Sequence, residues 1–380
     1  MLIKKKQIAF ITGTRADFGK IKTLINKVLN SEEFSLNLFV TGMHLEQKYG
    51  YTIKEIENSG FKDFIFPFIN TSTSGDMEMK LAKTVEGFST FVRNRKIDLI
   101  VVHGDRPETL AGAIVGSFNN ILVAHIEGGE VSGTIDEMIR HSTSKLSHFH
   151  FVSNNQARNR LIRFGEDPKN IVCIGNPDID ILLHGNLPSL NQVKSRYEII
   201  FSEYSIVLFH PVTTDFDFDK KIRIFIDSLL KIKENFIVIY PNDDKGNDKI
   251  IYEYEKNFRD RSNFKIFPSL RFEYYLTLLK NSKFIIGNSS SGVHEAPYFK
   301  KPTINVGTRQ NLRSKQESII NVDFSEKELL ASYFKAINNN FNYDVEYGDG
   351  RSSEIFLKTI LKKSFWKIDL QKYLFGDGEN

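Results

Sequence analysis

The chain has 380 residues, 41% of them hydrophobic and 26% charged, and its 51 basic and 47 acidic residues leave a net charge of +4. This composition is typical of a globular protein of about two domains, and so small a charge excludes nucleic-acid binding through a basic surface. No signal peptide and no apolar run of about 18 residues or more is present, so we expect no contact with a membrane. A single cysteine cannot form an intrachain disulfide, which fits a reducing compartment, and we expect a cytoplasmic protein.

Short apolar runs alternate with helical patterns along the first half of the chain. The runs expected to form strands are 7–12, 36–40, 64–68, 99–102, 121–126, 148–152 and 171–174. Strands that alternate with helices predict a parallel, doubly wound sheet of the α/β class.

The first strand leads into Gly13-Thr14-Arg15 and then into an amphipathic helix. Backbone N–H groups and Arg15 at the start of that helix suit an anion, although Arg15 alone is as easily a surface residue. The turn lacks the GxGxxG pattern of dinucleotide sites. The sequence also has no HExxH, no Cys/His cluster and no acids in metal-binding spacing, so we expect neither a metal nor a cofactor.

Acidic residues follow two neighbouring strands of the expected sheet. The strand at 99–102 ends in HGD with Asp105, the strand at 121–126 ends at Glu127, and Asp136 stands near the start of the next helix. Open α/β sheets bind ligands beyond the carboxyl ends of their strands, so these three acids are candidate site residues. Each acid alone is equally well explained as a helix cap, or for Asp136 as an i,i+4 partner of Arg140. Their occurrence together favours a site.

The segment 183–190 combines Gly, Asn and Pro and is the expected linker between domains 1–185 and 186–380. The second domain repeats the α/β rhythm, with strands expected at 205–209, 236–240, 265–267, 284–286 and 303–306. Polar residues follow these strands, among them His210 and Asn242. The tail from Glu326 is expected to be helical, and its segment around Trp366 can pack back on the first domain.

The sharpest local pattern is FIIGNSSSG, which leads into VHEAPYF. It gathers N–H groups and the hydroxyls of Ser289 and Ser290 at one point, which suits a diphosphate. An ordinary serine N-cap needs one hydroxyl, not three followed by glycine. Glu295 either complements the helix dipole or accepts hydrogen bonds from ribose hydroxyls. Arg309, just past a strand, can bind a phosphate through two hydrogen bonds.

Taken together, the motifs resemble the UDP-N-acetylglucosamine 2-epimerases. They are HGDR, HIEGGEVSGTIDE followed by IRH, HPVTT, GNSSSG and INVGTRQ, in order from GTRADFGK near the start to GTRQ around residue 309. Within that family, HGDR and HPVTT are similar to the hydrolysing branch used in bacterial sialic acid synthesis. The resemblance implies two Rossmann-like domains facing a cleft, as in the B-type nucleotide-sugar glycosyltransferases (the GT-B fold). It also implies a homodimer or homotetramer.

The resemblance implies a reaction as well: UDP-N-acetylglucosamine and water give N-acetylmannosamine and UDP, through a 2-acetamidoglucal. The first domain then carries most of the catalytic acids, since Asp105, Glu127 and Asp136 match the family's catalytic carboxylates; His210 matches its cleft histidine. Which carboxylate is acid and which is base stays open. The residues that match nucleotide-binding positions are Arg15, Asn242, Ser289, Ser290, Glu295 and Arg309.

Other interpretations stay open. The same reaction can act on UDP-2,4-diacetamido-2,4,6-trideoxyglucose or on a GDP-linked sugar, for legionaminic acid, and the motifs for diphosphate binding and catalysis would be shared. A GT-B glycosyltransferase would instead transfer the sugar intact to an acceptor, and the clustered acids argue against it. A non-hydrolysing 2-epimerase would leave the nucleotide on the sugar.

Overall fold

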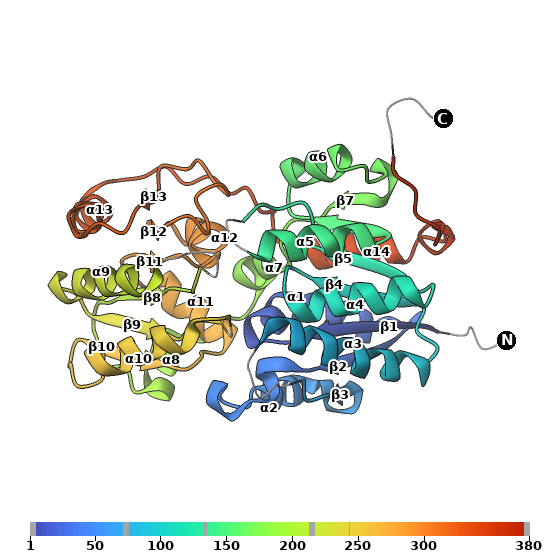
Figure 1. Cartoon of the computed structure of the whole chain (residues 1–380), viewed down its shortest axis with the longest axis horizontal. Helices are drawn as coiled ribbons and strands as arrows, with labels where there is room; N and C mark the ends of the chain where they lie inside the picture. Colours follow the sequence, from blue (N-terminus) through green and yellow to red (C-terminus); the bar gives the residue numbers. More distant parts are fainter. Residues whose placement is uncertain (1–4, 71–75, 133–134, 213–216, 243, 376–380) are drawn as a thin grey trace. The chain divides into compact units, whose positions relative to one another are not determined.

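The computed structural model describes residues 5–70, 76–132, 135–212, 217–242 and 244–375. Residues 133–134 of the HIEGGEVSGTIDE motif and 213–214 of HPVTT lie outside the described part. The chain forms two compact units, each built on one parallel sheet (Figure 1). The first unit comprises Met1–Glu130, Asp136–Gly185 and Tyr347–Asn380, and the second comprises Val131–Ile135 and Asn186–Glu346. The first unit thus includes the C-terminal segment, and the second includes a short piece of the first half.

The sheet of the first unit has the strand order β3-β2-β1-β4-β5-β6-β7, and all neighbouring strands run parallel. The strands are β1 (Lys6–Thr12), β2 (Phe34–Val40), β3 (Ile65–Pro67), β4 (Leu99–His103), β5 (Leu122–Ile126), β6 (Phe149–Val152) and β7 (Ile171–Cys173). Every strand predicted for this half is confirmed. Cys173 is exposed, because β7 is the edge strand.

The helices of the first unit lie between these strands. They are α1 (Arg15–Leu29), α2 (Ile53–Ile56), α3 (Met77–Arg93), α4 (Pro107–Phe118), α5 (Ile135–Leu146), α6 (Asn155–Arg163), α7 (Pro177–His184) and α14 (Ser352–Ile360). Thr14 caps α1 by accepting a hydrogen bond of 3.1 Å from the backbone N–H of Asp17. The cap satisfies one of the N–H groups that a helix start leaves without a partner.

The C-terminal segment completes the core of the first unit. Phe356 of α14 packs between Phe10 of β1 and Phe151 of β6, with ring centres 6.4 and 4.9 Å apart. Trp366 follows in the short turn Phe365–Lys367 and packs on Phe34 of β2. In Figure 1, α14 (red) accordingly lies among the blue and green elements of this unit.

The sheet of the second unit has the order β10-β9-β8-β11-β12-β13, again parallel throughout. Its strands are β8 (Ser205–Leu208), β9 (Phe236–Ile239), β10 (Phe264–Phe267), β11 (Ile285–Gly287), β12 (Thr303–Val306) and β13 (Ile319–Val322). Its helices are α8 (Leu190–Tyr197), α9 (Phe218–Lys231), α10 (Asn247–Phe258), α11 (Phe272–Lys280), α12 (Ser291–His294) and α13 (Glu326–Asn338). The sequence did not predict β13, because a run as short as Ile-Ile-Asn-Val does not by itself distinguish strand from helix.

The strand order reverses between β1 and β4 in the first sheet and between β8 and β11 in the second. Ligands of doubly wound sheets bind at such switch points, beyond the carboxyl ends of the strands. Arg15 and Asp105 follow β1 and β4, and His210 and Ser289 follow β8 and β11. Each unit therefore carries predicted site residues at its own switch point. Among the described residues, no helix is long and apolar enough to cross a membrane.

Candidate active site

Asp105 forms an ion pair with Arg140 of α5, whose side chain is 1% exposed. Asp105 stands directly after Gly104, which follows β4 with a φ of 75°. The left-handed backbone there is readily adopted by glycine and turns the chain sharply at the strand end. The Arg140 guanidinium also lies 3.5 Å from the carbonyl of Glu130. Arg140 thus connects α5 to the turns after β4 and β5.

Arg140 is surrounded by negative charge. Burial by itself would lower the pKa of this guanidinium, but neighbouring carboxylates outweigh burial and raise the pKa. These carboxylates belong to Asp105, Glu130, Glu127 and Asp136. All three acids predicted from the sequence are therefore near one buried cation. The i,i+4 pairing of Asp136 with Arg140 does not fully explain these residues, because Arg140 forms an ion pair with Asp105, 35 positions earlier in the chain.

Glu127 is held between two cationic groups. Its carboxylate lies 3.3 Å from Nε2 of His103 and 3.8 Å from the ammonium of Lys20. Lys20 also lies 3.4 Å from the fully buried carboxylate of Asp178. The backbone of Glu127 has a φ of 64°, a value uncommon outside glycine, while its N–H bonds the carbonyl of Phe151. Such backbone conformations cluster at functional sites.

A chain of hydrogen-bonded polar groups extends from His103, the partner of Glu127, to His44. His103 is bonded through Nδ1 to Asp17 at 2.6 Å, and Asp17 accepts a hydrogen bond of 2.5 Å from the hydroxyl of Thr12. Nε2 of His44 lies 3.2 Å from the hydroxyl of Thr12, and Nδ1 of the same ring lies 2.8 Å from the hydroxyl of Thr52. Burial lowers the pKa of His44 to about 4, so this imidazole is neutral at pH 7.

Arg15 stands at the start of α1, as predicted, and its guanidinium lies 2.6 Å from the carboxylate of Glu55. Both side chains are mostly buried. Arg15 is therefore not the plain surface residue that one interpretation of the sequence allowed. Its role toward a phosphate stays a prediction.

In the second unit, His210 is fixed by its neighbours after β8. Its backbone N–H donates to Oδ1 of Asn288 at 2.7 Å, and the side-chain amide of Asn288 donates back to its carbonyl at 2.9 Å. The backbone N–H of Asn242 donates to Nδ1 of His210 at 3.0 Å. Because Nδ1 accepts, a neutral His210 carries its proton on Nε2.

The serine turn, residues 289–291, is connected to His210 through Asn288, which precedes it in the chain. Arg309 donates a hydrogen bond of 3.1 Å to the carbonyl of Asn288, the residue before Ser289. Ser289 accepts a bond of 3.3 Å from the N–H of Ser291. Ser290 is the N-cap of α12, but its side chain makes no capping hydrogen bond. The simple interpretation of the pattern as a serine N-cap therefore does not hold for Ser290.

Glu295 ends α12 and is 1% exposed. It is the C-cap of this four-residue helix, and a carboxylate at the C-terminal end of a helix does not complement the helix dipole as the sequence allowed. The helix is short because Pro297 follows in the turn Ala296–Phe299. The contacts of the second unit thus join His210 to Arg309 through Asn288 and to Asn242 directly. Ser289 and Ser290 follow Asn288 directly in the chain.

Several residues of these two clusters were not predicted as site residues: His103, Asp17, Lys20, Arg140 and Asn288. His103 and Arg140 stand inside the quoted motifs HGDR and IRH, and Asn288 inside GNSSSG, so proximity to a motif was a usable signal. Asp17 and Lys20 likewise stand inside the quoted motif GTRADFGK, but their partners are distant in sequence, so no local pattern indicated that they contact His103 and Glu127. Within the described residues, no group of three or more His, Cys, Asp or Glu side chains is arranged to hold a metal ion.

Comparisons with known proteins agree on one family. The family model for UDP-N-acetylglucosamine 2-epimerase matches residues 26–361. The UDP-N-acetylglucosamine 2-epimerase of Neisseria meningitidis is 42% identical over 97% of this chain and 98% of its own length. The UDP-N,N'-diacetylbacillosamine 2-epimerase (hydrolyzing) of Legionella pneumophila is 35% identical over 93% and 96%. The structure of Methanocaldococcus jannaschii UDP-GlcNAc 2-epimerase in complex with UDP-GlcNAc and UDP has the same fold, with a TM-score of 0.83 and 22% identity over 93% and 99% of the two chains.

Proposed function

The chain belongs to the UDP-N-acetylglucosamine 2-epimerase family, and from this premise we propose that it is a hydrolysing 2-epimerase that supplies N-acetylmannosamine for sialic acid synthesis. Its substrates are UDP-N-acetylglucosamine and water, and its products are N-acetylmannosamine and UDP. The observation that carries the proposal is the cluster of Asp105, Glu127 and Asp136 around one buried arginine. A transferase that moves an intact sugar has no use for several carboxylates that exchange protons.

The reaction has two steps. In the first, the C1–O bond breaks with its electron pair leaving on UDP, and a carboxylate takes the proton from C2, which gives 2-acetamidoglucal. In the second, the hydroxyl of water adds to C1 and a proton is delivered to C2 from the opposite face. Because the C2 proton of the sugar is not acidic, C1–O cleavage leads, and carboxylates stabilise the oxocarbenium-like charge. Two acids then serve as base and acid on opposite faces.

We assign Glu127 to the base. Its carboxylate faces His103 and Lys20, and both cations favour the ionised form that can accept a proton. Asp105 and Asp136 are then left for charge stabilisation and proton delivery. Asp105 is paired with Arg140, which favours a stabilising charge, so Asp136 is the better candidate for the acid.

The second unit is assigned the nucleotide. Ser290 offers a hydroxyl that closes no helix cap, and Arg309 offers a buried guanidinium beside the same turn. Hydroxyl and guanidinium donors to a diphosphate form strong, charge-assisted hydrogen bonds. A neutral His210, with Nδ1 engaged by Asn242, presents Nε2–H as a further donor.

One alternative substrate has support of its own. The Legionella relative is named for UDP-N,N'-diacetylbacillosamine, which is the 2,4-diacetamido-2,4,6-trideoxyglucose nucleotide expected as an alternative from the sequence. The Neisseria relative is the more similar of the two in identity, and it is named for UDP-N-acetylglucosamine. We therefore favour UDP-N-acetylglucosamine.

Proton NMR of the purified protein with each nucleotide sugar tests the proposal. We expect free N-acetylmannosamine and UDP from UDP-N-acetylglucosamine, without NAD or added metal. Faster turnover of the diacetamido nucleotide would change the substrate but keep the reaction. A product that is UDP-N-acetylmannosamine, with the nucleotide still attached, would overturn the hydrolysing assignment.

A further inference from the structure

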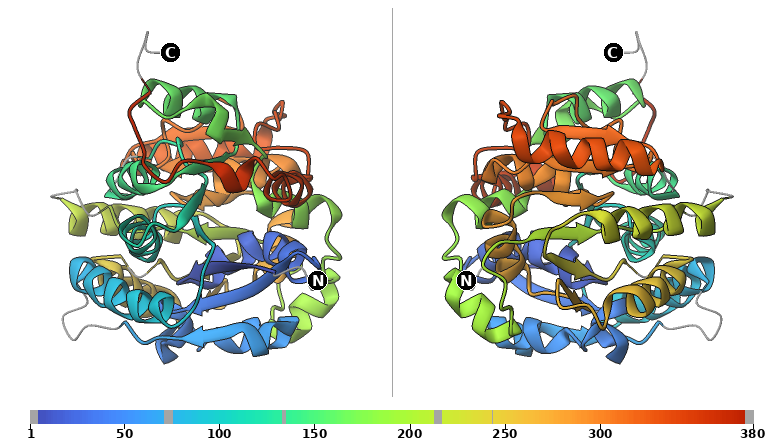
Figure 2. Two further views of the ribbon diagram at one scale, coloured as in Figure 1. Left: turned by 90° about the vertical axis from the view of Figure 1, so that its right-hand side faces the viewer. Right: turned by 90° about the vertical axis from the view of Figure 1, so that its left-hand side faces the viewer.

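The C-terminal segment that follows the Phe365–Lys367 turn is bound along α5, β6 and α6 of the first unit (Figure 2). Nε2 of His148 donates to the carbonyl of Leu370 at 3.2 Å, and the N–H of Phe375 donates to the carbonyl of Gly165 at 3.0 Å. The segment borders a groove of about 1070 Å³, and no predicted site residue lines that groove. The groove beside the C-terminal segment therefore does not include Asp105, Glu127 or Asp136.

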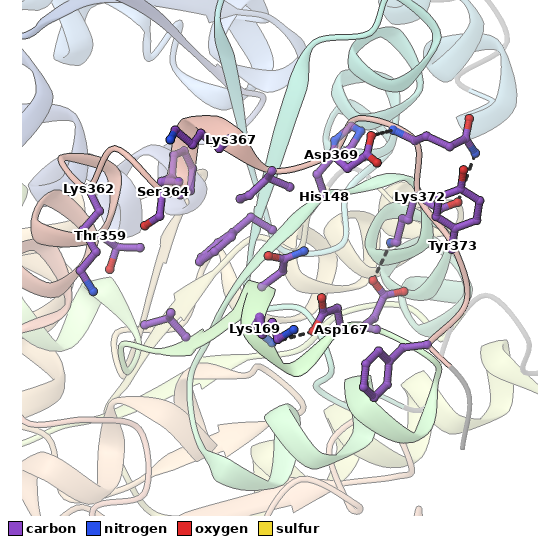
Figure 3. Close-up of a pocket in the computed structure, with 18 of the residues that line it drawn as sticks. His148, Asp167, Lys169, Thr359, Lys362, Ser364, Lys367, Asp369, Lys372 and Tyr373 are labelled. Atoms are coloured by element: carbon purple, nitrogen blue, oxygen red, sulfur yellow. Dashed lines mark hydrogen bonds and ion pairs between the residues drawn. The ribbon is translucent and has the colours of Figure 1, made fainter. Parts of the chain in front are cut away.

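Lys372 of this segment holds the C-terminal end of α5. Its ammonium lies close to three backbone carbonyls and one carboxylate: Ser144 at 2.9 Å, Lys145 at 2.9 Å, Ser147 at 2.7 Å and Glu166 at 2.6 Å. Figure 3 shows the Lys372 side chain extended toward a carboxylate at this groove. The last carbonyls of a helix have no partner within the helix and carry the negative end of its dipole. A lysine from a remote segment is here a partner of the carbonyls of Ser144 and Lys145, of which Ser144 also accepts from the backbone N–H of Ser147.

Glu166 keeps this lysine in place. Its carboxylate is 2% exposed and also bonds Nε2 of His150 at 2.9 Å. Burial opposes ionisation of Glu166, but the hydrogen bond with His150 and the charge of Lys372 outweigh burial and lower the pKa of Glu166 to about 2. The carboxylate is therefore charged throughout the neutral range, and the ammonium has a permanent counter-ion.

The same turn of α5 is tied on its inner side to the turn that carries Asp105. The hydroxyl of Ser144 lies 3.0 Å from Nδ1 of His125, and Nε2 of His125 lies 2.8 Å from the carbonyl of Gly104. A carbonyl only accepts, so Nε2 carries the proton and Nδ1 accepts from Ser144. Burial lowers the pKa of His125 to about 3, which keeps this neutral tautomer at pH 7. Gly104 directly precedes Asp105.

Through these contacts and helix α5, Lys372 is connected to Asp105. One helical turn before Ser144, α5 carries Arg140, whose guanidinium pairs with Asp105. We propose that Lys372 is a positioning residue for the reaction: by fixing the last turn of α5, it sets Arg140 against Asp105. This inference rests on the proposed function, since only there is Asp105 assigned to the chemistry. A misplacement of about 1 Å far from the reacting atoms can reduce the rate by roughly a hundredfold.

The test replaces Lys372 by methionine, which keeps the length of the side chain and removes the charge. The matched control is Lys367→Met, which removes the same charge from a residue that lines the same groove but belongs to the Phe365–Lys367 turn. We expect kcat of Lys372→Met to fall about tenfold or more, with KM and the calorimetric affinity for UDP unchanged. Lys367→Met should match the wild type, and Lys372→Arg, which keeps the cation, should recover most of kcat.

Amide hydrogen exchange supplies a readout that needs no turnover. Below its own melting temperature, Lys372→Met should exchange faster than Lys367→Met in the last turn of α5. A wild-type kcat in Lys372→Met, or no recovery by Lys372→Arg, would overturn the inference and leave the proposed function intact. Failure of the wild type to hydrolyse any nucleotide sugar would overturn the proposed function, and exchange would then decide whether Lys372 fixes α5.

Discussion

Nδ1 of His103 lies 2.6 Å from the carboxylate of Asp17, a residue 86 positions earlier in the chain. Nε2 of the same ring faces Glu127 at 3.3 Å. Burial would lower the pKa of His103, but the charge of Glu127 and the hydrogen bonds to both acids outweigh burial and raise it to about 10. The ring is therefore an imidazolium between two carboxylates at neutral pH.

This pairing predicts a loss of stability at high pH. Because the pKa of His103 is raised from 6.5 to about 10 on folding, its contribution is complete below pH 6.5 and is lost as the pH rises through 10. Breaking a buried ion pair costs roughly 3–5 kcal/mol. We expect His103→Gln to lower the free energy of unfolding by an amount of that order at pH 6.5, and the difference from wild type to shrink toward pH 10. Urea unfolding of both proteins at constant ionic strength, repeated across this pH range, measures the difference in unfolding free energy.

The control for this series is His141→Gln. The His141 ring is half-buried and pairs with Glu137 of its own helix at 2.9 Å. The free energy of unfolding of His141→Gln should stay within about 0.5 kcal/mol of the wild-type value across the series, as for most surface substitutions. If the difference for His103→Gln were constant between pH 6.5 and 10, the ring would not be an imidazolium in the folded protein.

The local part of this architecture could be predicted from sequence, and the side-chain pairing could not. Strands such as 99–102 are visible because apolar, β-branched runs recur between helical patterns, and the acids after them follow from the rule for parallel sheets. The partners Asp17 and Lys372 are distant in sequence from the groups they hold. Which distant lysine reaches a helix end depends on packing that no local pattern records.

A second prediction separates ligand binding from capping at the serine turn. Since the side chain of Ser290 closes no helix cap, Ser290→Ala should change the free energy of unfolding by less than about 0.5 kcal/mol. If its hydroxyl donates to the diphosphate, UDP affinity should fall by roughly 1.5–3 kcal/mol, the value of a hydrogen bond to a charged group. Isothermal calorimetry with UDP and urea unfolding measure the two effects.

Ser291→Ala is the matched control, because the hydroxyl of Ser291 is bonded to that of Tyr275 inside the unit. Removing it should cost roughly 1–3 kcal/mol of stability by leaving a buried hydroxyl unpaired, while UDP affinity stays unchanged. Equal UDP affinities for the wild type and Ser290→Ala would remove Ser290 from the nucleotide site.

The last prediction concerns the three carboxylates near Arg140. If they only support the fold, Asp105→Asn, Glu127→Gln and Asp136→Asn should cost stability and leave turnover nearly intact. If they carry the chemistry, the amides cannot exchange protons or balance a developing cation. Loss of general acid–base catalysis is worth roughly 10²–10⁴-fold. We therefore expect at least one variant to fold, to bind UDP, and to lose about a hundredfold or more in kcat.

The control is Glu137→Gln, one residue after Asp136 in the same first turn of α5 but paired with His141 at a more exposed position. It should keep the wild-type kcat. In heavy water, the wild-type product should also carry deuterium at C2, because the proton removed in the elimination is not the one delivered in the hydration. A product with hydrogen retained at C2 would rule out the glucal intermediate. Near-normal turnover in all three amide variants would assign Asp105, Glu127 and Asp136 to the fold alone.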